Sequence, residues 1–231
     1  MITQSGLRSL RQPNHPPTLP EQASEAQHYY LTLLRACSVG TCDAENPVTT
    51  LGITSCYPGE GVSTVAIELS VAAAATGMRV LLVDLNWKRP AIHQAFAVER
   101  GPGLSEALAN EGREHPAIQA SHISNLSLLT IGYYVGDFNL VISLEKMSRL
   151  IRSLHEYELI VFDLCESAEA GPSLSLSSLL EGVLLVVEAE RVRWEVALRV
   201  KELLIRSGAN LLGVVLNKRC QRIPNWLYRS L

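Results

Sequence analysis

Residues 55–64 read Ser-Cys-Tyr-Pro-Gly-Glu-Gly-Val-Ser-Thr and lie between an apolar run and a segment of helical pattern. A strand, a glycine-rich turn and a helix N-terminus together form an anion site, because backbone N–H groups and the helix dipole face the turn. Glycine lets the backbone approach a phosphate closely, and the Ser63-Thr64 pair in the first helical turn offers a hydroxyl to a magnesium ion. The segment therefore predicts a phosphate-binding loop.

The same segment meets only half of the P-loop pattern GxxxxGK[ST]. Cys56 stands where the first glycine belongs, and Val62 stands where the lysine belongs. An alternative interpretation is a tight Pro-Gly-Glu-Gly turn before a helix that Ser63 caps. The segment alone leaves both interpretations open.

Two aspartates add to the case for a nucleotide site. Asp84 and Asp163 each follow directly on four apolar residues that are typical of a buried strand. Ligands of an open parallel sheet bind outside the carboxyl ends of its strands, and a carboxylate there can hold magnesium directly or through water. Either aspartate alone could be an N-cap or loop residue. Asn217 ends the last apolar run in the same way, and its amide could contact an adenine.

The elements that must position these residues alternate along the chain between strand-like and helix-like segments. A first helical pattern begins at Glu21, and three further ones cover Ser63–Thr76, Leu140–His155 and Trp194–Ser207. Gly77 and Gly208 stand at the expected C-caps of the helices that precede them. The expected strands are Thr50–Thr54, Arg79–Val83, Leu126–Ile131, Leu159–Phe162, Gly182–Val187 and Leu211–Leu216. This alternation predicts an α/β fold, a doubly wound, mostly parallel sheet with helices on both faces. We expect a flexible proline-rich tail over 1–20, one domain over 21–219 and a short tail over 220–231.

Composition narrows the class of protein. The chain has 231 residues and a formal net charge of −3, which argues against a nucleic-acid partner. It contains neither an apolar run of membrane-spanning length nor the pattern of a signal peptide. Its five cysteines show no CxxC spacing, and we expect reduced thiols in a cytoplasmic protein.

From about Glu25 to Arg219 the chain resembles the bacterial tyrosine kinases (BY-kinases) of capsule and exopolysaccharide synthesis, P-loop proteins related to the MinD and ParA ATPases. The resemblance is strongest over 53–90, including Lys88-Arg89-Pro90, and extends to Gly103-Leu104-Ser105 and to the last two strands. It implies ATP or ADP with Mg²⁺ as the cofactor and a P-loop NTPase fold. By position, the phosphate and base contacts would come from Gly59, Glu60, Gly61, Ser63, Thr64 and Asn217. The magnesium shell would be Ser63, Asp84 and Asp163.

The chain departs from the family pattern where catalysis or its regulation is concerned. Val62 replaces the P-loop lysine, Asn86 replaces a second aspartate, and Leu164-Cys165-Glu166 replaces a Thr-Pro-Pro turn. A ring-forming Glu-x-x-Arg-x-x-Arg motif keeps only its glutamate, and Tyr228 alone stands for a C-terminal tyrosine cluster. These losses predict a pseudo-kinase whose nucleotide binding is weak or lost.

The predicted function is therefore a catalytically degenerate regulator or adaptor of exopolysaccharide or capsule biosynthesis and export. Its expected partner is the cytosolic part of a membrane polysaccharide co-polymerase, which would recruit it to the inner face of the plasma membrane, and self-association is left open. One alternative is an active ATPase or tyrosine kinase in which Lys88, Arg89 or a partner's cation replaces the lysine. Another is a MinD/ParA-like positioning ATPase, which is disfavoured because Tyr57 holds the place of that class's additional lysine.

Overall fold

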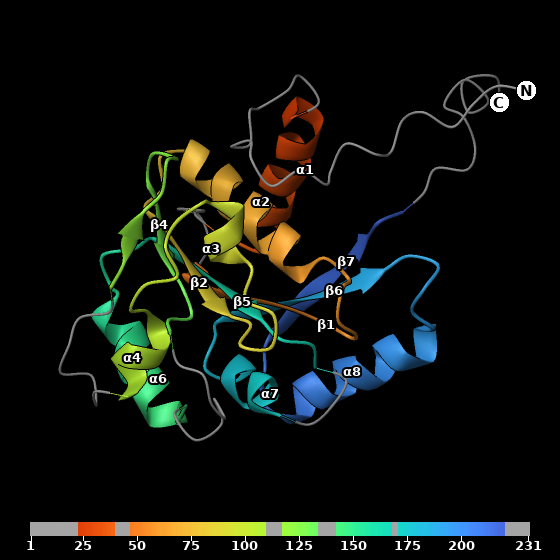
Figure 1. Ribbon diagram of the computed structural model, residues 1–231. Helices are drawn as coiled ribbons and strands as arrows, with labels where there is room; N and C mark the ends of the chain where they lie inside the picture. The colour runs from red at the N-terminus through yellow and green to blue at the C-terminus, as the bar shows by residue number, and fades with distance from the viewer. Residues whose placement is uncertain (1–22, 40–46, 110–116, 134–141, 168–170, 220–231) are drawn as a thin grey trace, which may run out of the picture.

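The computed structural model describes residues 23–39, 47–109, 117–133, 142–167 and 171–219 (Figure 1). Its centre is a seven-stranded sheet with the strand order β3-β4-β2-β5-β1-β6-β7. Neighbouring strands are parallel except β3 and β4, which are antiparallel. The strands are β1 Thr50–Ser55, β2 Val80–Leu85, β3 Gln119–Ala120, β4 Leu126–Leu129, β5 Leu159–Leu164, β6 Gly182–Glu188 and β7 Leu211–Asn217.

The central strands are buried on both faces, which explains their continuous apolar sequences. Every residue of β1, β2 and β5 is buried. Strands covered by helices on both sides cannot alternate apolar and polar residues, because neither face meets water. The predicted central strands are confirmed on this basis.

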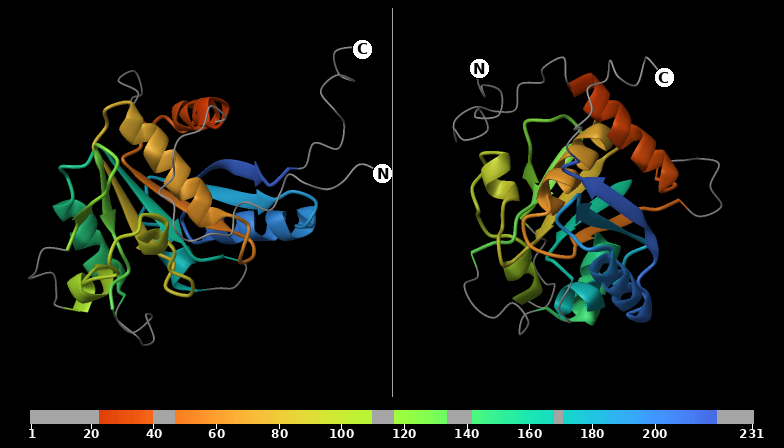
Figure 2. Two further views of the ribbon diagram at one scale, coloured as in Figure 1. Left: turned by 45° about the horizontal axis from the view of Figure 1, so that its top comes forward. Right: turned by 90° about the vertical axis from the view of Figure 1, so that its right-hand side faces the viewer.

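Helices cover both faces of the sheet, as Figures 1 and 2 show. One apolar cluster joins the sheet to α1 Ala23–Ala36, α2 Val62–Ala75 and α3 Ile92–Ala95. The second cluster joins the opposite face to α4 Leu104–Ala109, α6 Leu144–Ser153, α7 Pro172–Ser177 and α8 Trp194–Arg206. The predicted doubly wound α/β fold is therefore confirmed.

The helix ends show where local sequence signals sufficed and where they did not. Gly77 (φ 96°) and Gly208 (φ 89°) follow α2 and α8 in the left-handed conformation, as predicted for C-cap glycines. The predicted start of the third helix at Leu140 is wrong, because the helix begins at Leu144. Ser143 is extended, and its hydroxyl accepts a hydrogen bond from the N–H of Lys146, which makes Ser143 the N-cap.

The two predicted tails, 1–20 and 220–231, lie outside the described residues. Residues 140 and 141 of the predicted third helix lie outside them as well. Over the described ranges, no helix combines the length and the apolar character needed to cross a bilayer.

Candidate functional site

The glycine-rich segment forms a loop between β1 and α2, and both of its glycines are required by the backbone. Gly59 (φ 85°) and Gly61 (φ 96°) are left-handed, a region that side chains disfavour. A Cβ atom on Gly61 would also lie 2.3 Å from Nδ2 of Asn217. Gly61 is the N-cap of α2 and no side chain caps the helix, so the alternative of a helix capped by Ser63 is wrong.

The loop presents a row of unused backbone donors. The first helical bond of α2 runs from the N–H of Val65 to the carbonyl of Gly61, so residues 62–64 have no intrahelical acceptor. Within the described part of the chain, no acceptor binds the N–H groups of residues 59–61 either. Consecutive N–H groups at a helix N-terminus are the arrangement that binds phosphate.

Glu60 contributes to this loop through its backbone. Its side chain is fully buried and turns back toward β1, where Oε2 accepts a hydrogen bond from the N–H of Cys56 at 3.0 Å. Burial raises the pKa of this carboxyl, although two backbone N–H groups and Arg191 lower it. The carboxylate therefore stabilises the turn, while the N–H of Glu60 remains available to a ligand.

Asp84 and Asp163 lie opposite each other at the carboxyl ends of β2 and β5 and are both fully buried. Asp84 accepts hydrogen bonds from the backbone N–H groups of Asn86 at 3.1 Å and of Ala91 and Ile92 at 3.2 Å. Burial raises the pKa of Asp84 to about 6, and these three donors oppose the rise. Asp84 is thus held in place by the segment that follows β2.

Asp163 has far less support than Asp84. Neither of its carboxylate oxygens has a hydrogen-bond partner among the described residues. Burial and the neighbouring charge of Asp84 raise its pKa to about 8, and Ser63 on the first turn of α2 lowers it more weakly. A buried carboxylate that lacks a partner suits a cation, and Mg²⁺ prefers carboxylate, hydroxyl, phosphate and water oxygens. Ser63, Asp84 and Asp163, which lie together here, would hold such an ion.

Val62 and Asn86, two of the positions that depart from the family pattern, contact other parts of the protein instead. The Val62 side chain is buried in the apolar cluster around α1 and α2. The Asn86 amide oxygen accepts hydrogen bonds from the N–H of Arg89 and from Sγ of Cys165. Lys88, which could have replaced the P-loop lysine, forms an ion pair with Glu166 at 2.7 Å.

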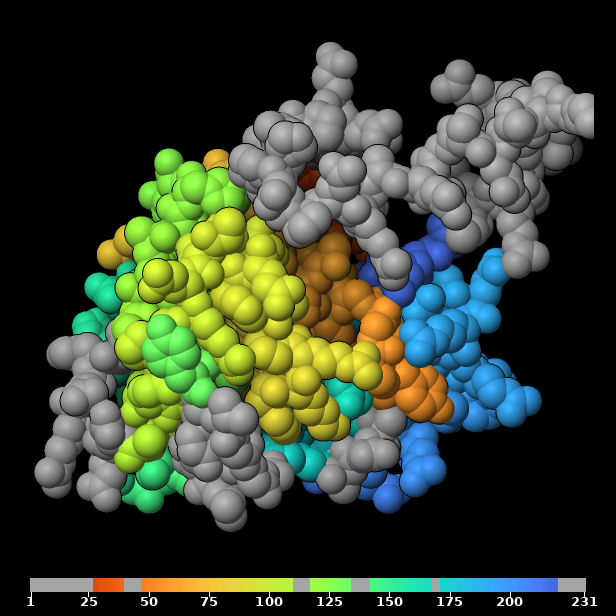
Figure 3. All heavy atoms as spheres, viewed as in Figure 1, coloured from red at the N-terminus to blue at the C-terminus, as the bar shows by residue number. Residues whose placement is uncertain are grey.

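Sequence reasoning missed two cations at the loop, Arg191 and Lys218. Nη2 of Arg191 donates to the carbonyl of Pro58 at 3.2 Å, and Nζ of Lys218 donates to that of Gly59 at 2.6 Å. The structure places Lys218 against the P-loop. Its position directly after the strand-end Asn217 was the available signal. Figure 3 shows the P-loop segment between the chain after β2 and the chain after β6.

Asn217 braces the same loop. Its Nδ2 donates to the carbonyl of Glu60 at 2.9 Å, and its Oδ1 accepts from the N–H of Lys218 at 2.9 Å. An amide has two N–H donors, so one remains for the predicted adenine contact. Thr64 is exposed on the first turn of α2, beside the predicted phosphate position.

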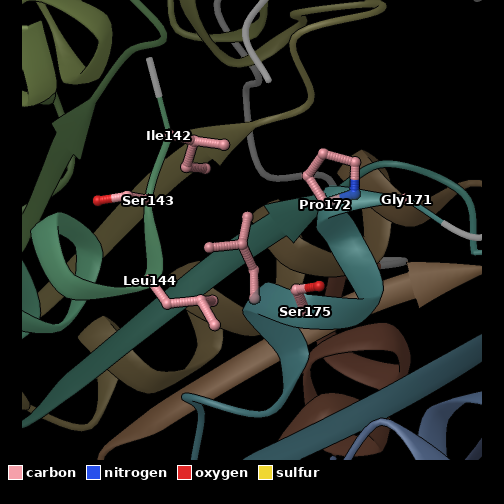
Figure 4. Close-up of a pocket in the computed structure, with 7 residues that line it drawn as sticks. Ile142, Ser143, Leu144, Gly171, Pro172 and Ser175 are labelled. Atoms are coloured by element: carbon pink, nitrogen blue, oxygen red, sulfur yellow. The ribbon is translucent and has the colours of Figure 1, made fainter. Parts of the chain in front are cut away.

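A separate hollow of about 360 Å³ lies between the N-terminal ends of α6 and α7 (Figure 4). Its lining is mainly apolar and includes Ile142, Leu144 and Pro172. None of its lining residues belongs to the P-loop or to the aspartate pair, so the hollow is separate from both.

A glycine-rich loop after β1 and paired carboxylates on neighbouring strands, set in a doubly wound sheet, place the chain in the P-loop NTPase-like fold class. No family model matches the chain. It is 32% identical over 166 residues to the tyrosine-protein kinase YwqD of Bacillus subtilis (strain 168), covering 71% of this chain and 70% of YwqD. The chain belongs to the bacterial tyrosine kinase family.

Two further relatives extend this finding. A putative tyrosine-protein kinase, CapB of Staphylococcus aureus, is 27% identical over 177 residues, which cover 76% of this chain and 78% of CapB. The succinoglycan biosynthesis transport protein ExoP of Rhizobium meliloti (strain 1021) is 29% identical over 189 residues. That match covers 79% of this chain and 24% of ExoP, so the similar part of ExoP sits within a longer protein.

Solved structures agree with the fold. The chimerical protein CapA2B2 aligns with a TM-score of 0.75 at 27% identity, over 91% of this chain and 88% of that chain. The kinase domain of the Escherichia coli tyrosine kinase ETK aligns with a TM-score of 0.79 at 21% identity, over 96% of this chain and 87% of that chain. The septum site-determining protein MinD of Pyrococcus horikoshii OT3, complexed with Mg-ADP, aligns with a TM-score of 0.62 at 25% identity, over 79% of this chain and 76% of that chain.

Proposed function

We propose that this chain is a regulator or adaptor of bacterial exopolysaccharide or capsule biosynthesis and export that binds ATP or ADP with Mg²⁺ weakly and transfers no phosphoryl group. One observation carries the proposal. The P-loop backbone and the aspartate pair are in place, while the position of the P-loop lysine holds Val62, buried in the apolar core. A P-loop protein without its P-loop lysine is better suited to binding a partner than to phosphoryl transfer.

The absence of the P-loop lysine ammonium should weaken nucleotide binding and slow phosphoryl transfer. Hydrogen bonds to charged groups contribute about 1.5–3 kcal/mol each. The loss of one lowers nucleotide affinity roughly tenfold to hundredfold. In a transition state, one preorganised donor is worth about a hundredfold to a thousandfold in rate. Asn86 also removes a carboxylate that the family uses near the metal or the accepting hydroxyl, so phosphoryl transfer loses two contributions together.

Weak nucleotide binding has its own support in the structure. The N–H groups of residues 59–64 face no protein acceptor that the described chain supplies, and they would take the phosphates. Ser63, Asp84 and Asp163 would hold Mg²⁺, whose charge offsets that of the phosphates when it is bound. One N–H of the Asn217 amide would contact the adenine.

The proposed partner is the cytosolic part of a membrane polysaccharide co-polymerase. Two relatives support this choice. In the succinoglycan biosynthesis transport protein, a segment like this chain occupies about a quarter of a longer protein, and CapA2B2 is a chimera. A chain that binds such a partner would act in the cytoplasm at the inner face of the plasma membrane.

A second candidate is an active ATPase or tyrosine kinase with a replacement cation. Its support is the contact of Lys218 and Arg191 with the P-loop carbonyls. Both cations donate to carbonyl oxygens, whereas a phosphate needs the opposite, N–H face of the loop. The adaptor is therefore the better supported of the two.

The test is phosphate release from ATP and phosphotyrosine formation, with and without the partner's cytosolic segment. We expect the wild type to match the Asp163→Asn variant, which has lost a metal ligand. The Val62→Lys/Asn86→Asp double variant should gain activity, because it restores both charged groups. Wild-type turnover that Asp163→Asn abolishes would overturn the proposal and favour the active enzyme.

A further inference from the structure

Three consecutive backbone carbonyls on the outer side of the P-loop accept hydrogen bonds from side chains of other segments. The carbonyl of Pro58 accepts from Arg191 at 3.2 Å, that of Gly59 from Lys218 at 2.6 Å, and that of Glu60 from Asn217 at 2.9 Å. The donors come from the loop after β6 and from the end of β7, far from the P-loop in sequence. Each carbonyl has a different donor.

These contacts set the direction of the N–H groups. The described peptide bonds are all trans, and in a trans peptide the C=O of one residue points opposite to the N–H of the next. Carbonyls 58, 59 and 60 point toward the donors, so the N–H groups of Gly59, Glu60 and Gly61 point the other way. These are the N–H groups that would meet a phosphate.

The backbone around Lys218 aims its side chain at the loop. Lys218 is left-handed (φ 55°), a conformation that residues other than glycine and asparagine seldom adopt. Its N–H donates to Oδ1 of Asn217, and the carbonyl of Asn217 accepts from the N–H of Ala189. A strained residue secured by its neighbours points to a functional constraint.

Glu188 completes the arrangement by joining the two cations. Its Oε2 lies 2.7 Å from Nη1 of Arg191 and 3.3 Å from Nζ of Lys218. The carboxylate thus holds both cationic heads beside the loop. A side chain at Gly61 would disturb this arrangement, because its Cβ would collide with Nδ2 of Asn217.

We propose that Arg191, Asn217 and Lys218 form a clamp that holds the P-loop N–H groups in their phosphate-binding orientation. These are positioning residues, and the inference rests on the proposed function in so far as it concerns nucleotide affinity. Without a P-loop lysine, affinity depends on N–H groups that need no rearrangement on binding, because ordering a loop costs free energy. The clamp supplies that preorganisation.

The experiment compares the wild type with Lys218→Met and with the control Lys201→Met, which removes the same charge from an exposed position on α8. Amide order parameters of Gly59 and Gly61 are measured without nucleotide. Affinities for ADP and for inorganic pyrophosphate are measured by calorimetry. Melting temperature serves as the control for folding.

In the wild type and in Lys201→Met we expect amide order parameters of about 0.85 for Gly59 and Gly61, the value of rigid backbone. In Lys218→Met we expect these order parameters to fall below about 0.6. ADP and pyrophosphate should both bind about tenfold more weakly to Lys218→Met, because the phosphate site itself is disordered. The melting temperature should change by less than about 3 °C, as for other surface substitutions.

Unchanged order parameters in Lys218→Met would overturn the clamp. Weaker binding of ADP with unchanged binding of pyrophosphate would also overturn it, since Lys218 would then contact the base or ribose. If the wild type binds neither ligand while Lys218→Met still loosens Gly59 and Gly61, the clamp stands and the nucleotide binding in the proposed function fails.

Discussion

Asp84 and Asp163 are register partners on the neighbouring parallel strands β2 and β5, and both carboxylates are fully buried beside the P-loop. Three backbone N–H groups stabilise Asp84, whereas neither oxygen of Asp163 has a partner in the described structure. Burial raises the pKa of Asp84 to about 6 against the effect of these donors, whereas burial and the charge of Asp84 together raise the pKa of Asp163 to about 8. Like charges side by side favour a shared proton or a bound cation.

The first prediction concerns pH and Mg²⁺. The pKa of each aspartate is higher in the folded chain than its ordinary value of 3.8, so the folded state binds more protons than the unfolded state. The free energy of unfolding should therefore fall as the pH rises from about 4 to about 8 in metal-free buffer. Thermal denaturation across this range checks it, and added Mg²⁺ should raise the melting temperature at pH 8 more than at pH 5.

Asp163→Asn should flatten this pH dependence and raise the metal-free melting temperature at pH 8. The asparagine side chain has nearly the same shape as aspartate, so the substitution removes the buried charge without changing the packing. It should also abolish the effect of Mg²⁺. Glu99→Gln, at an exposed carboxylate, is the matched control and should leave the pH profile unchanged. An Asp163→Asn profile as steep as that of the wild type would show that the pair does not govern the pH dependence.

The second prediction separates backbone strain from a steric clash at the P-loop. Gly61 and Gly77 have the same φ of 96°, but a Cβ at Gly77 meets nothing within 4 Å, whereas one at Gly61 meets Asn217. Gly77→Ala should cost about 1–2 kcal/mol for a left-handed alanine. Gly61→Ala should cost about 1–3 kcal/mol more, because it also displaces the Asn217 hydrogen bond. Urea unfolding of both variants measures the difference, and equal losses would contradict the contact.

The third prediction concerns thiol reactivity. Burial raises the pKa of Cys56 and of Cys165 to about 12, from an ordinary value of 9.0. Only the thiolate reacts with iodoacetamide, so at pH 8 both residues should be alkylated at least about a hundredfold more slowly in the folded protein than in urea. Peptide mass spectrometry distinguishes them from the other cysteines. Rapid labelling of Cys56 in the folded protein would show that the P-loop opens easily.

The sequence was sufficient for those parts of the site that depend on buried strands. Asp84 and Asp163 follow apolar runs whose burial on both faces is visible in their composition, and parallel strands bring their carboxyl ends to one edge. The P-loop was predictable because Gly59 and Gly61 lie directly before a helical pattern. These signals are local or depend on one regular feature of the sheet.

The missed features depend on contacts between distant segments. Lys218 reaches the P-loop because of an unusual backbone conformation, and nothing in the pattern of β7 predicts a left-handed lysine. The two-residue strand β3 is defined only by its pairing with β4. The start of α6 was misplaced because apolar residues before Ser143 continue the helical pattern, while the capping hydroxyl ends it.

The most direct test of the central claim is calorimetric titration of Mg-ADP into the wild type, Val62→Lys and Val62→Met. The methionine variant fills the same space without charge and controls for changes in packing at this buried position. We predict weak wild-type binding, no gain for Val62→Met and a gain of about tenfold to hundredfold for Val62→Lys, the contribution of one charge-assisted hydrogen bond. Tight wild-type binding that Val62→Lys does not improve would contradict the account, because another group would then already serve as the P-loop cation.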